Sequence, residues 1–227
     1  MNPQAQCPTG RHYDLLVFDW DGTLMDSTST IVHAIQAAFR DLGKPVPPAR
    51  DCRFVIGYAL KEAIHYLAPH SDDAELVRLV EAYRHHFVTG ERKLELFDGV
   101  LEYLPRLRDA GYMMAVATGK ARGGLNRMLD LTGIGPLFDV TRCADEAFSK
   151  PHPAMLEYII DFTGAEPSRT LMIGDTTHDL QLAINAGTWG AALSYGAHPL
   201  EDMLHLKPVA HFDDFPSLAR WLLEGEK

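Results

Sequence analysis

The chain has 227 residues, 46% of them hydrophobic and 23% charged, which is the composition of a globular protein with one domain or a main domain with a smaller insertion. No apolar segment is long enough to cross a bilayer, so the sequence argues against a membrane-spanning protein. The net charge of −10, without clusters of Lys and Arg, argues against a nucleic-acid-binding surface.

The start of the chain and its cysteines predict the compartment. Residues 1–11 have neither a basic opening nor an apolar run, so we expect a loose lead-in and not an export signal. The chain has three cysteines, Cys7, Cys52 and Cys143. Their number is odd, and no two of them form a Cys-x-x-Cys pair. This pattern favours a reducing compartment without disulfides or structural zinc, and we predict a cytoplasmic protein.

Short runs rich in Val, Ile and Leu alternate with longer stretches of helical period. The expected strands are residues 13–18, 113–118, 138–142, 170–174, 190–193 and 209–212. Strands that alternate with helices are typical of a parallel sheet with helices on its faces. We therefore predict an α/β protein with a Rossmann-like, three-layer α/β/α core.

A long interruption separates the first two expected strands. Residues 26–96 contain no convincing strand, and apolar residues recur at helical spacing in 31–39 and 76–83. Pro45, Pro47 and Pro48 break this helical region internally. We predict a helical cap domain over residues 26–96, inserted into a catalytic core made of residues 12–25 and 97–227.

The first strand ends in the pentapeptide Asp19-Trp20-Asp21-Gly22-Thr23. A buried strand that ends in two carboxylates delivers them to the edge of a sheet, where α/β enzymes bind their ligands. One carboxylate could attack phosphorus while the other transfers the proton, and both offer oxygen ligands to a divalent cation. Alternation along the strand turns Trp20 away from this edge, so we expect it to pack in the core.

Three further signals fall where the same site would need them. Thr118 and Gly119 end the second strand and offer a hydroxyl group and a closely approachable backbone to a phosphate. Lys150 precedes a predicted helix and supplies a cation. Asp175 and Asp179 follow the fourth strand, and their spacing places both carboxylates on one side of a starting helix.

In this order, the motifs resemble those of the haloacid dehalogenase-like hydrolase superfamily, in the subgroup with a helical cap after the first strand. The resemblance covers nearly the whole chain. Three segments are most similar to the phosphoglycolate phosphatase group, namely residues 24–27, 97–100 and 149–151. The resemblance implies a phosphatase that acts on a small phosphorylated metabolite, with 2-phosphoglycolate as the leading candidate.

The resemblance also implies a role for each motif residue. Asp19 would be the nucleophile that becomes an aspartyl phosphate, and Asp21 would be the general acid and base. Mg²⁺ would be held by the Asp19 carboxylate, the Asp21 backbone carbonyl and Asp175. The phosphoryl group would be bound by Thr118, Gly119 and Lys150, and Asp179 would support Lys150 or the metal.

Several other functions remain open from the sequence. An acid at position 21 argues against a dehalogenase, whose leaving group needs no proton, and against a phosphonatase. A sugar phosphomutase shares the catalytic pair, but it typically carries Thr and His where this chain has Ser27 and Ile31. A catalytically inactive module that binds a phosphate or a protein is the remaining alternative.

Substrate choice should depend on the cap, because the core contacts only the phosphoryl group. The candidate substrate-binding residues in the cap are Arg53, Gly57, Tyr58 and Lys61. Lys120 and Arg122 could add positive potential at the mouth of the site. His178 lies inside the fourth motif, but we expect it to be structural. We expect a monomer or a weak homodimer.

Overall fold

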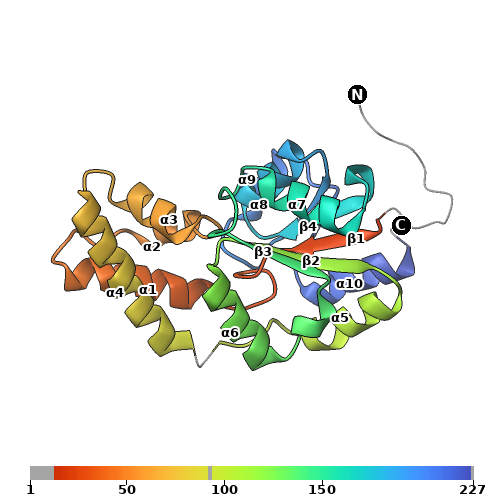
Figure 1. The fold of residues 1–227 in the computed structure, drawn as a ribbon, viewed down its shortest axis with the longest axis horizontal. Helices are drawn as coiled ribbons and strands as arrows, with labels where there is room; N and C mark the ends of the chain where they lie inside the picture. Colours follow the sequence, from red (N-terminus) through yellow and green to blue (C-terminus); the bar gives the residue numbers. More distant parts are fainter. Residues whose placement is uncertain (1–12, 92–93, 226–227) are drawn as a thin grey trace.

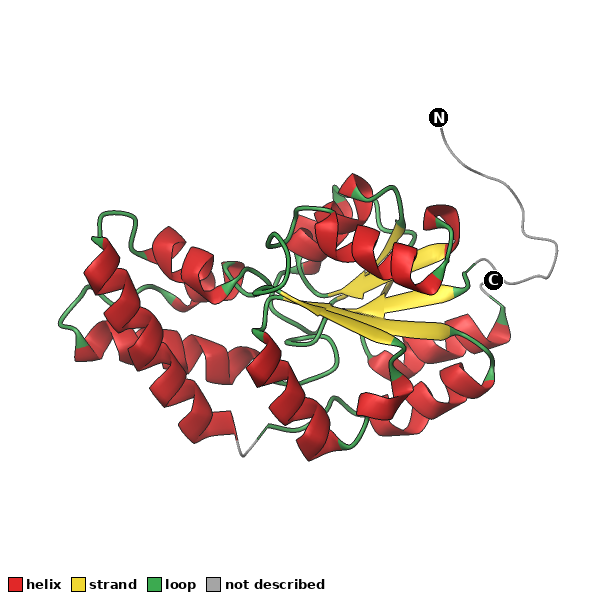
Figure 2. Cartoon of the chain, in the orientation of Figure 1, coloured by secondary structure: helices red, strands yellow, loops and turns green. Residues whose placement is uncertain are grey.

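The computed structural model describes residues 13–91 and 94–225. The expected lead-in of residues 1–11, which includes Cys7, lies outside the described residues, as does residue 12. Six parallel strands form one sheet in the order β3-β2-β1-β4-β5-β6. Figure 2 shows the sheet in yellow with helices on either side. They are β1 (Leu15–Phe18), β2 (Met113–Thr118), β3 (Val140–Cys143), β4 (Thr170–Gly174), β5 (Trp189–Leu193) and β6 (Ala210–Phe212). The predicted α/β class with a parallel sheet is confirmed.

The strands match the predicted segments to within two residues at each end. The largest differences are at the starts of β1 and β3, which begin at Leu15 and Val140 instead of residues 13 and 138. The chain before β3 forms a 3₁₀ turn, Gly135–Leu137, and the Phe138 N–H donates to the Gly135 carbonyl at 3.1 Å. This local bond uses the backbone group that a longer strand would need.

Helices cover both faces of the sheet (Figure 1). Along β1, Leu16 and Phe18 pack on one face with α5 (Val100–Asp109), α6 (Arg122–Thr132) and α10 (Phe215–Glu224). The alternate residues Leu15 and Val17 pack on the other face with α7 (Ala154–Thr163) and α8 (Thr177–Asn185). A short helix, α9 (Leu200–Leu204), packs against α8 and β5. Because successive side chains of a strand point to opposite faces, the continuous apolar runs bury both sides.

Of the five helices between β1 and β2, the first four pack on one another and away from the sheet (Figure 1). We call them the cap helices, and they are α1 (Thr28–Asp41), α2 (Ala49–Phe54), α3 (Leu60–Leu67) and α4 (Asp73–Glu91). They enclose their own apolar core, in which Ala38, Ile64 and Leu79 are fully buried. The helical period predicted for residues 31–39 and 76–83 corresponds to α1 and α4.

Two connections join the cap helices to the sheet, and they run side by side. Met25 and Leu96 form an isolated antiparallel bridge. Next to it, the Asp26 N–H donates to Glu95 and the Phe97 N–H donates to Leu24, at 2.9 and 3.0 Å. Apart from this bridge, the described part of residues 26–96 holds no strand. None of the described helices is long and apolar enough to cross a membrane.

Candidate active site

Three neighbouring strands bring the predicted motifs to one edge of the sheet. β1 lies between β2 and β4, and Phe18 is aligned with Val116 and Ile173. Asp19 therefore follows β1 beside Thr118 at the end of β2 and Asp175 after β4. In an open parallel sheet, ligands bind at the carboxyl ends of the strands where the strand order reverses, and β1 stands at that reversal.

Asp19 is a buried carboxylate that pairs with Lys150 through its Oδ1 atom. Its side chain is 1% exposed, and Lys150 Nζ lies 2.8 Å from Asp19 Oδ1 as an ion pair. The other carboxylate oxygen, Oδ2, has no hydrogen-bond partner among the described residues. Burial raises the pKa of Asp19 to about 7, although Lys150 lowers it, and the charges of Asp179 and Asp21 raise it further. A buried carboxylate with one oxygen left unpartnered calls for a ligand.

Asp21 is oriented by a residue of the cap side and by a lysine of the core. Ser27 Oγ donates to Asp21 Oδ1 at 2.6 Å. Lys120 Nζ lies 2.9 and 3.0 Å from the two carboxylate oxygens and 4.5 Å from the centre of the Phe87 ring on α4. The sequence predicted only a general positive potential from Lys120, whereas the structure shows a direct contact with the predicted acid and base.

Asp175 is fully buried and held from two sides. Thr23 Oγ1 donates to Asp175 Oδ1 at 2.6 Å, and the Ala197 N–H donates to Oδ2 at 2.7 Å. A Cβ atom at Gly22 or Gly196 would stand 2.2 or 2.1 Å from Oδ2, so only glycine fits at these two positions. Burial, followed by the charges of Asp19 and Asp179, raises the pKa of Asp175 well above its ordinary value.

Lys150 and Asp179 form a buried ion pair beneath Asp19. Lys150 Nζ donates to Asp179 Oδ1 at 2.6 Å, and both side chains are fully buried. Burial alone would lower the pKa of Lys150, but Asp179 and Asp19 raise it above its ordinary value, so the amine stays charged. The other oxygen of Asp179 accepts from the Thr176 N–H at 3.0 Å and from Thr176 Oγ1 at 2.6 Å, which caps α8.

The acidic groups at this edge fit a divalent cation. One carboxylate oxygen from each of Asp19, Asp175 and Asp179 lies within 4.8 Å of the others. Of these three buried carboxylates, Asp19 and Asp179 contact Lys150, and Asp19 Oδ2 has no hydrogen-bond partner among the described residues. Oxygen donors and excess negative charge suit Mg²⁺. Because both Asp179 oxygens are engaged by Lys150 and Thr176, the supporting role predicted for Asp179 fits better than direct ligation.

The motif at the end of β2 lies against the loop that joins α2 and α3. Thr118 is buried, and its hydroxyl oxygen accepts from the Lys120 N–H at 3.1 Å. A Cβ atom at Gly119 would stand 2.6 Å from the carbonyl oxygens of both Gly57 and Tyr58. Gly119 therefore permits the loop before α3 to approach the core closely.

His178, which we expected to be structural, contacts both ends of this loop. Its Nε2 lies 2.7 Å from the Phe54 carbonyl oxygen, and its ring stacks on Tyr58 with centroids 4.0 Å apart. His198 Nε2 lies 3.1 Å from the same carbonyl. Because a carbonyl oxygen only accepts, both rings carry a proton on Nε2. Burial lowers the pKa of His178 to about 4, so its ring is neutral at neutral pH.

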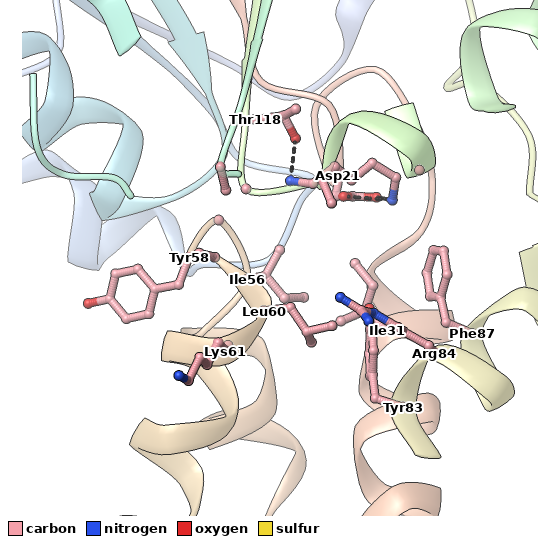
Figure 3. A pocket seen from close by; sticks show the side chains of 18 of the residues that line it. Asp21, Ile31, Ile56, Tyr58, Leu60, Lys61, Tyr83, Arg84, Phe87 and Thr118 are labelled. Carbon is pink, nitrogen blue, oxygen red and sulfur yellow. Dashed lines mark hydrogen bonds and ion pairs between the residues drawn. The ribbon is translucent and has the colours of Figure 1, made fainter. Parts of the chain in front are cut away.

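A cavity of about 570 Å³ lies between the sheet edge and the cap helices (Figure 3). Asp19, Asp21 and Thr118 line its core side. Of the cap residues predicted to contact substrate, the ones that line it are Gly57, Tyr58 and Lys61. Arg53 is exposed and does not line the cavity, and Arg122 is instead paired with Glu146 at 2.7 Å.

Sequence reasoning missed the part of the cavity that α4 supplies. Tyr83, Arg84 and Phe87 line it although they lie more than sixty residues from Asp19 in the chain. Arg84 extends toward the middle of the cavity (Figure 3). The one sequence pattern that indicated this is the helical spacing of Tyr83 and Phe87, which places both aromatic side chains on the same face of α4.

Comparisons with known proteins identify a family with the same fold and motifs. The family described as haloacid dehalogenase-like hydrolase matches residues 16–192. The chain belongs to the haloacid dehalogenase-like hydrolase family. Within it, a protein of Dickeya dadantii named "Probable phosphatase IndB" is 36% identical over 206 residues, covering 88% of this chain and 90% of the relative.

Two further family members show how widely the similarity extends. A phosphoglycolate phosphatase of Aliivibrio fischeri is 30% identical over 213 residues, covering 90% of this chain and 94% of the relative. The solved structure of a haloacid dehalogenase-like family hydrolase from Streptococcus pneumoniae superimposes with a TM-score of 0.79 at 24% identity, over 92% of this chain and 98% of that one. The haloacid dehalogenase-like hydrolase fold therefore spans the sheet and the cap helices.

Proposed function

We propose that this haloacid dehalogenase-like hydrolase is a Mg²⁺-dependent phosphomonoester phosphatase that acts through an aspartyl phosphate on Asp19. One observation carries the proposal. Asp19 is buried at the edge of the sheet, Lys150 pairs with its Oδ1 at 2.8 Å, and its Oδ2 has no hydrogen-bond partner among the described residues. The relatives named as phosphatases support the same class of reaction.

In the first step, an Asp19 oxygen attacks phosphorus and the bond from phosphorus to the ester oxygen breaks. Asp21 gives its proton to the departing alkoxide, and the free alcohol leaves. Ser27 and Lys120 hold the Asp21 carboxyl group in place for this transfer. Lys150 balances the negative charge that spreads over the phosphoryl oxygens, and the Thr118 hydroxyl orients them.

In the second step, Asp21 removes a proton from water, and the water oxygen attacks phosphorus. The bond between phosphorus and Asp19 breaks, which releases phosphate and restores both carboxyl groups. Asp19 and Asp175, with the Asp21 backbone carbonyl, would hold Mg²⁺, which when bound supplies positive charge to the phosphoryl oxygens. The cap helices over residues 26–96 would close over the core and exclude bulk water.

The observations favour a hydrolase over the two alternatives. Ile31 lines the cavity where a sugar phosphomutase typically carries a histidine, so no imidazole is placed there for proton transfer. The convergence of Asp19, Asp21, Lys150 and Asp175 at one edge supports turnover and argues against an inactive binding module. Action as a monomer or weak homodimer in the cytoplasm stays a prediction.

A phosphate-release assay tests the proposed function. The wild-type chain and Asp19→Asn are assayed with a panel of phosphomonoesters that includes 2-phosphoglycolate, with Mg²⁺ and with a chelator. We expect release that needs Mg²⁺ and is lost in Asp19→Asn, because an amide cannot act as the nucleophile. Equal turnover by Asp19→Asn, with a background enzyme excluded, would contradict the proposal.

A further inference from the structure

The cavity reaches well beyond the groups that would bind a phosphoryl group. Asp19, Asp21 and Thr118 line its core side together with residues of α6 and of the segment after β3, and the remainder extends between α1, α3 and α4 (Figure 3). Its volume of about 570 Å³ falls within the range of pockets that enclose ligands of drug size, roughly 300–1,000 Å³. A two-carbon body such as that of 2-phosphoglycolate would leave most of this volume to water.

The cap side of the cavity has apolar walls. The side chains that form them come from α1, the α2–α3 loop, α3 and α4, and they include Ile31, Ile35, Ile56, Leu60, Tyr83 and Phe87. Ile56 and Leu60 lie opposite Phe87 and Tyr83 across the space, and Ile31 lies on the same side as Tyr83 (Figure 3). Water against such walls gains few hydrogen bonds, so displacing it with an apolar group is favourable.

Several charged groups also line the cavity. Lys120 already contacts Asp21 and lies over the Phe87 ring. Tyr58 and Lys61 extend away from the apolar walls (Figure 3). Arg84 reaches into the cavity beside the aromatic side chains of α4, and a guanidinium group in such a place can stack on a ring as well as bind an oxygen. On the core side the cavity is also lined by Arg127, whose Nη1 donates to the Gly123 carbonyl at 3.0 Å, and by Asp145, whose Oδ1 accepts from the Arg122 N–H at 2.9 Å. A large apolar body, and a ring above all, is compatible with the apolar walls and with Arg84.

We propose that the substrate is a phosphomonoester of an alcohol with a bulky, mainly apolar body of at least one ring, which the apolar walls of the cap bind. The inference rests on the proposed phosphatase function, and it narrows that function to a class of substrate. It differs from the small, fully polar substrate in the name of the Aliivibrio fischeri relative. The core would recognise the phosphoryl group, while the cap would select the body.

A series of esters with similar leaving groups tests this directly. Ethyl, butyl, benzyl and 3-phenylpropyl phosphate all release primary alcohols, so differences in kcat/KM report mainly on binding of the body. We expect kcat/KM to rise by about fourfold for each methylene group that the walls bury, and benzyl phosphate to exceed ethyl phosphate by roughly tenfold or more. 2-Phosphoglycolate should be a poorer substrate than benzyl phosphate.

A pair of matched variants shows whether the walls cause this preference. Leu60 and Leu67 are both half-buried leucines at opposite ends of α3, but only Leu60 lines the cavity. Leu60→Gln should reduce the ratio of kcat/KM for benzyl phosphate to that for ethyl phosphate by about tenfold. Leu67→Gln should leave the ratio unchanged, because it introduces the same side chain away from the cavity.

A binding measurement separates failure of this inference from failure of the proposed function. Benzylphosphonate and ethylphosphonate are not hydrolysed, and with Mg²⁺ present the benzyl compound should raise Tm more. Hydrolysis of ethyl phosphate or 2-phosphoglycolate at least as efficient as that of benzyl phosphate would overturn the substrate class and leave the phosphatase function standing. Absence of turnover with every ester would overturn the proposed function itself, and the substrate class with it.

Discussion

Lys150 Nζ lies 2.6 Å from Asp179 Oδ1, and both side chains are buried completely. The same amine reaches Asp19 Oδ1 at 2.8 Å, so a single positive charge links the predicted nucleophile to the capped start of α8. Burying the Lys150 ammonium without Asp179 would cost free energy, because the loss of its hydration would not be compensated by an opposite charge. The ion pair thereby makes Lys150 important for both stability and chemistry.

Lys150→Met should lower stability and activity together. Removing one partner of a buried ion pair costs about 3–5 kcal/mol, and loss of the charge that faces the phosphoryl group should reduce kcat by roughly 10²–10³. Urea unfolding and initial rates measure the two effects. Lys44→Met is a suitable control, because the Lys44–Glu75 pair is partly exposed and should contribute at most about 1 kcal/mol. Equal effects of the two substitutions would contradict this role.

Thr23→Val should weaken the metal site without removing a ligand. Valine has the shape of threonine, but it cannot donate the 2.6 Å hydrogen bond that orients Asp175. Loss of such a supporting bond typically costs about 10–100-fold in metal affinity, so the Mg²⁺ concentration for half-maximal activity should rise by that factor. Thr23→Ser keeps the hydroxyl group and should behave like the wild type. An unchanged Mg²⁺ requirement in Thr23→Val would exclude this effect.

Gly119→Ala should disturb the contact between core and cap. The new Cβ atom would stand 2.6 Å from two backbone oxygens, those of Gly57 and Tyr58, so the loop before α3 has to move. A displacement of about 1 Å can cost as much as 10²-fold in rate, and we expect kcat/KM to fall by roughly 10–100-fold. At Gly135 the nearest atom would be Leu129 Cβ at 3.5 Å, so Gly135→Ala should retain activity. A fully active Gly119→Ala would show that the close approach is dispensable.

His178 should make stability depend on pH. Burial lowers its pKa from 6.5 to about 4, so between these values the unfolded chain binds more protons than the folded one. The contribution of the neutral ring is complete above pH 6.5 and decreases as the pH falls toward 4, by on the order of 1 kcal/mol per pH unit. Measured by urea unfolding, the stability difference between wild type and His178→Gln should shrink over this window. A difference that stays constant from pH 7 to pH 4 would contradict the assignment.

The sheet and the motifs at its edge could be predicted because each is local in sequence. An apolar run followed at once by Asp19 or Asp175 identifies both the strand and the end that carries the chemistry. Contacts within a few residues, such as the Thr176–Asp179 cap, follow from the same spacing. Parallel pairing then places the strand ends at one edge without further information.

The cap side could not be predicted in the same way, because it depends on how helices distant in sequence pack against one another. Arg53 belongs to the segment expected to contact substrate, yet it is exposed on α2 and does not line the cavity. Arg84, on α4, reaches the cavity instead. The attachment of the Phe54 carbonyl to His178 joins residues 124 positions apart, and no local pattern indicates such a pair.

The central claim is that Asp19 becomes phosphorylated during turnover. The most direct measurement is to quench the reaction during the first turnovers, reduce any aspartyl phosphate with borohydride and locate the product by mass spectrometry. The mechanism predicts homoserine at position 19 in the wild type with substrate and Mg²⁺, and none without substrate or in Asp19→Asn. Conversion of a different aspartate, or rapid phosphate release with Asp19 unmodified throughout, would contradict it.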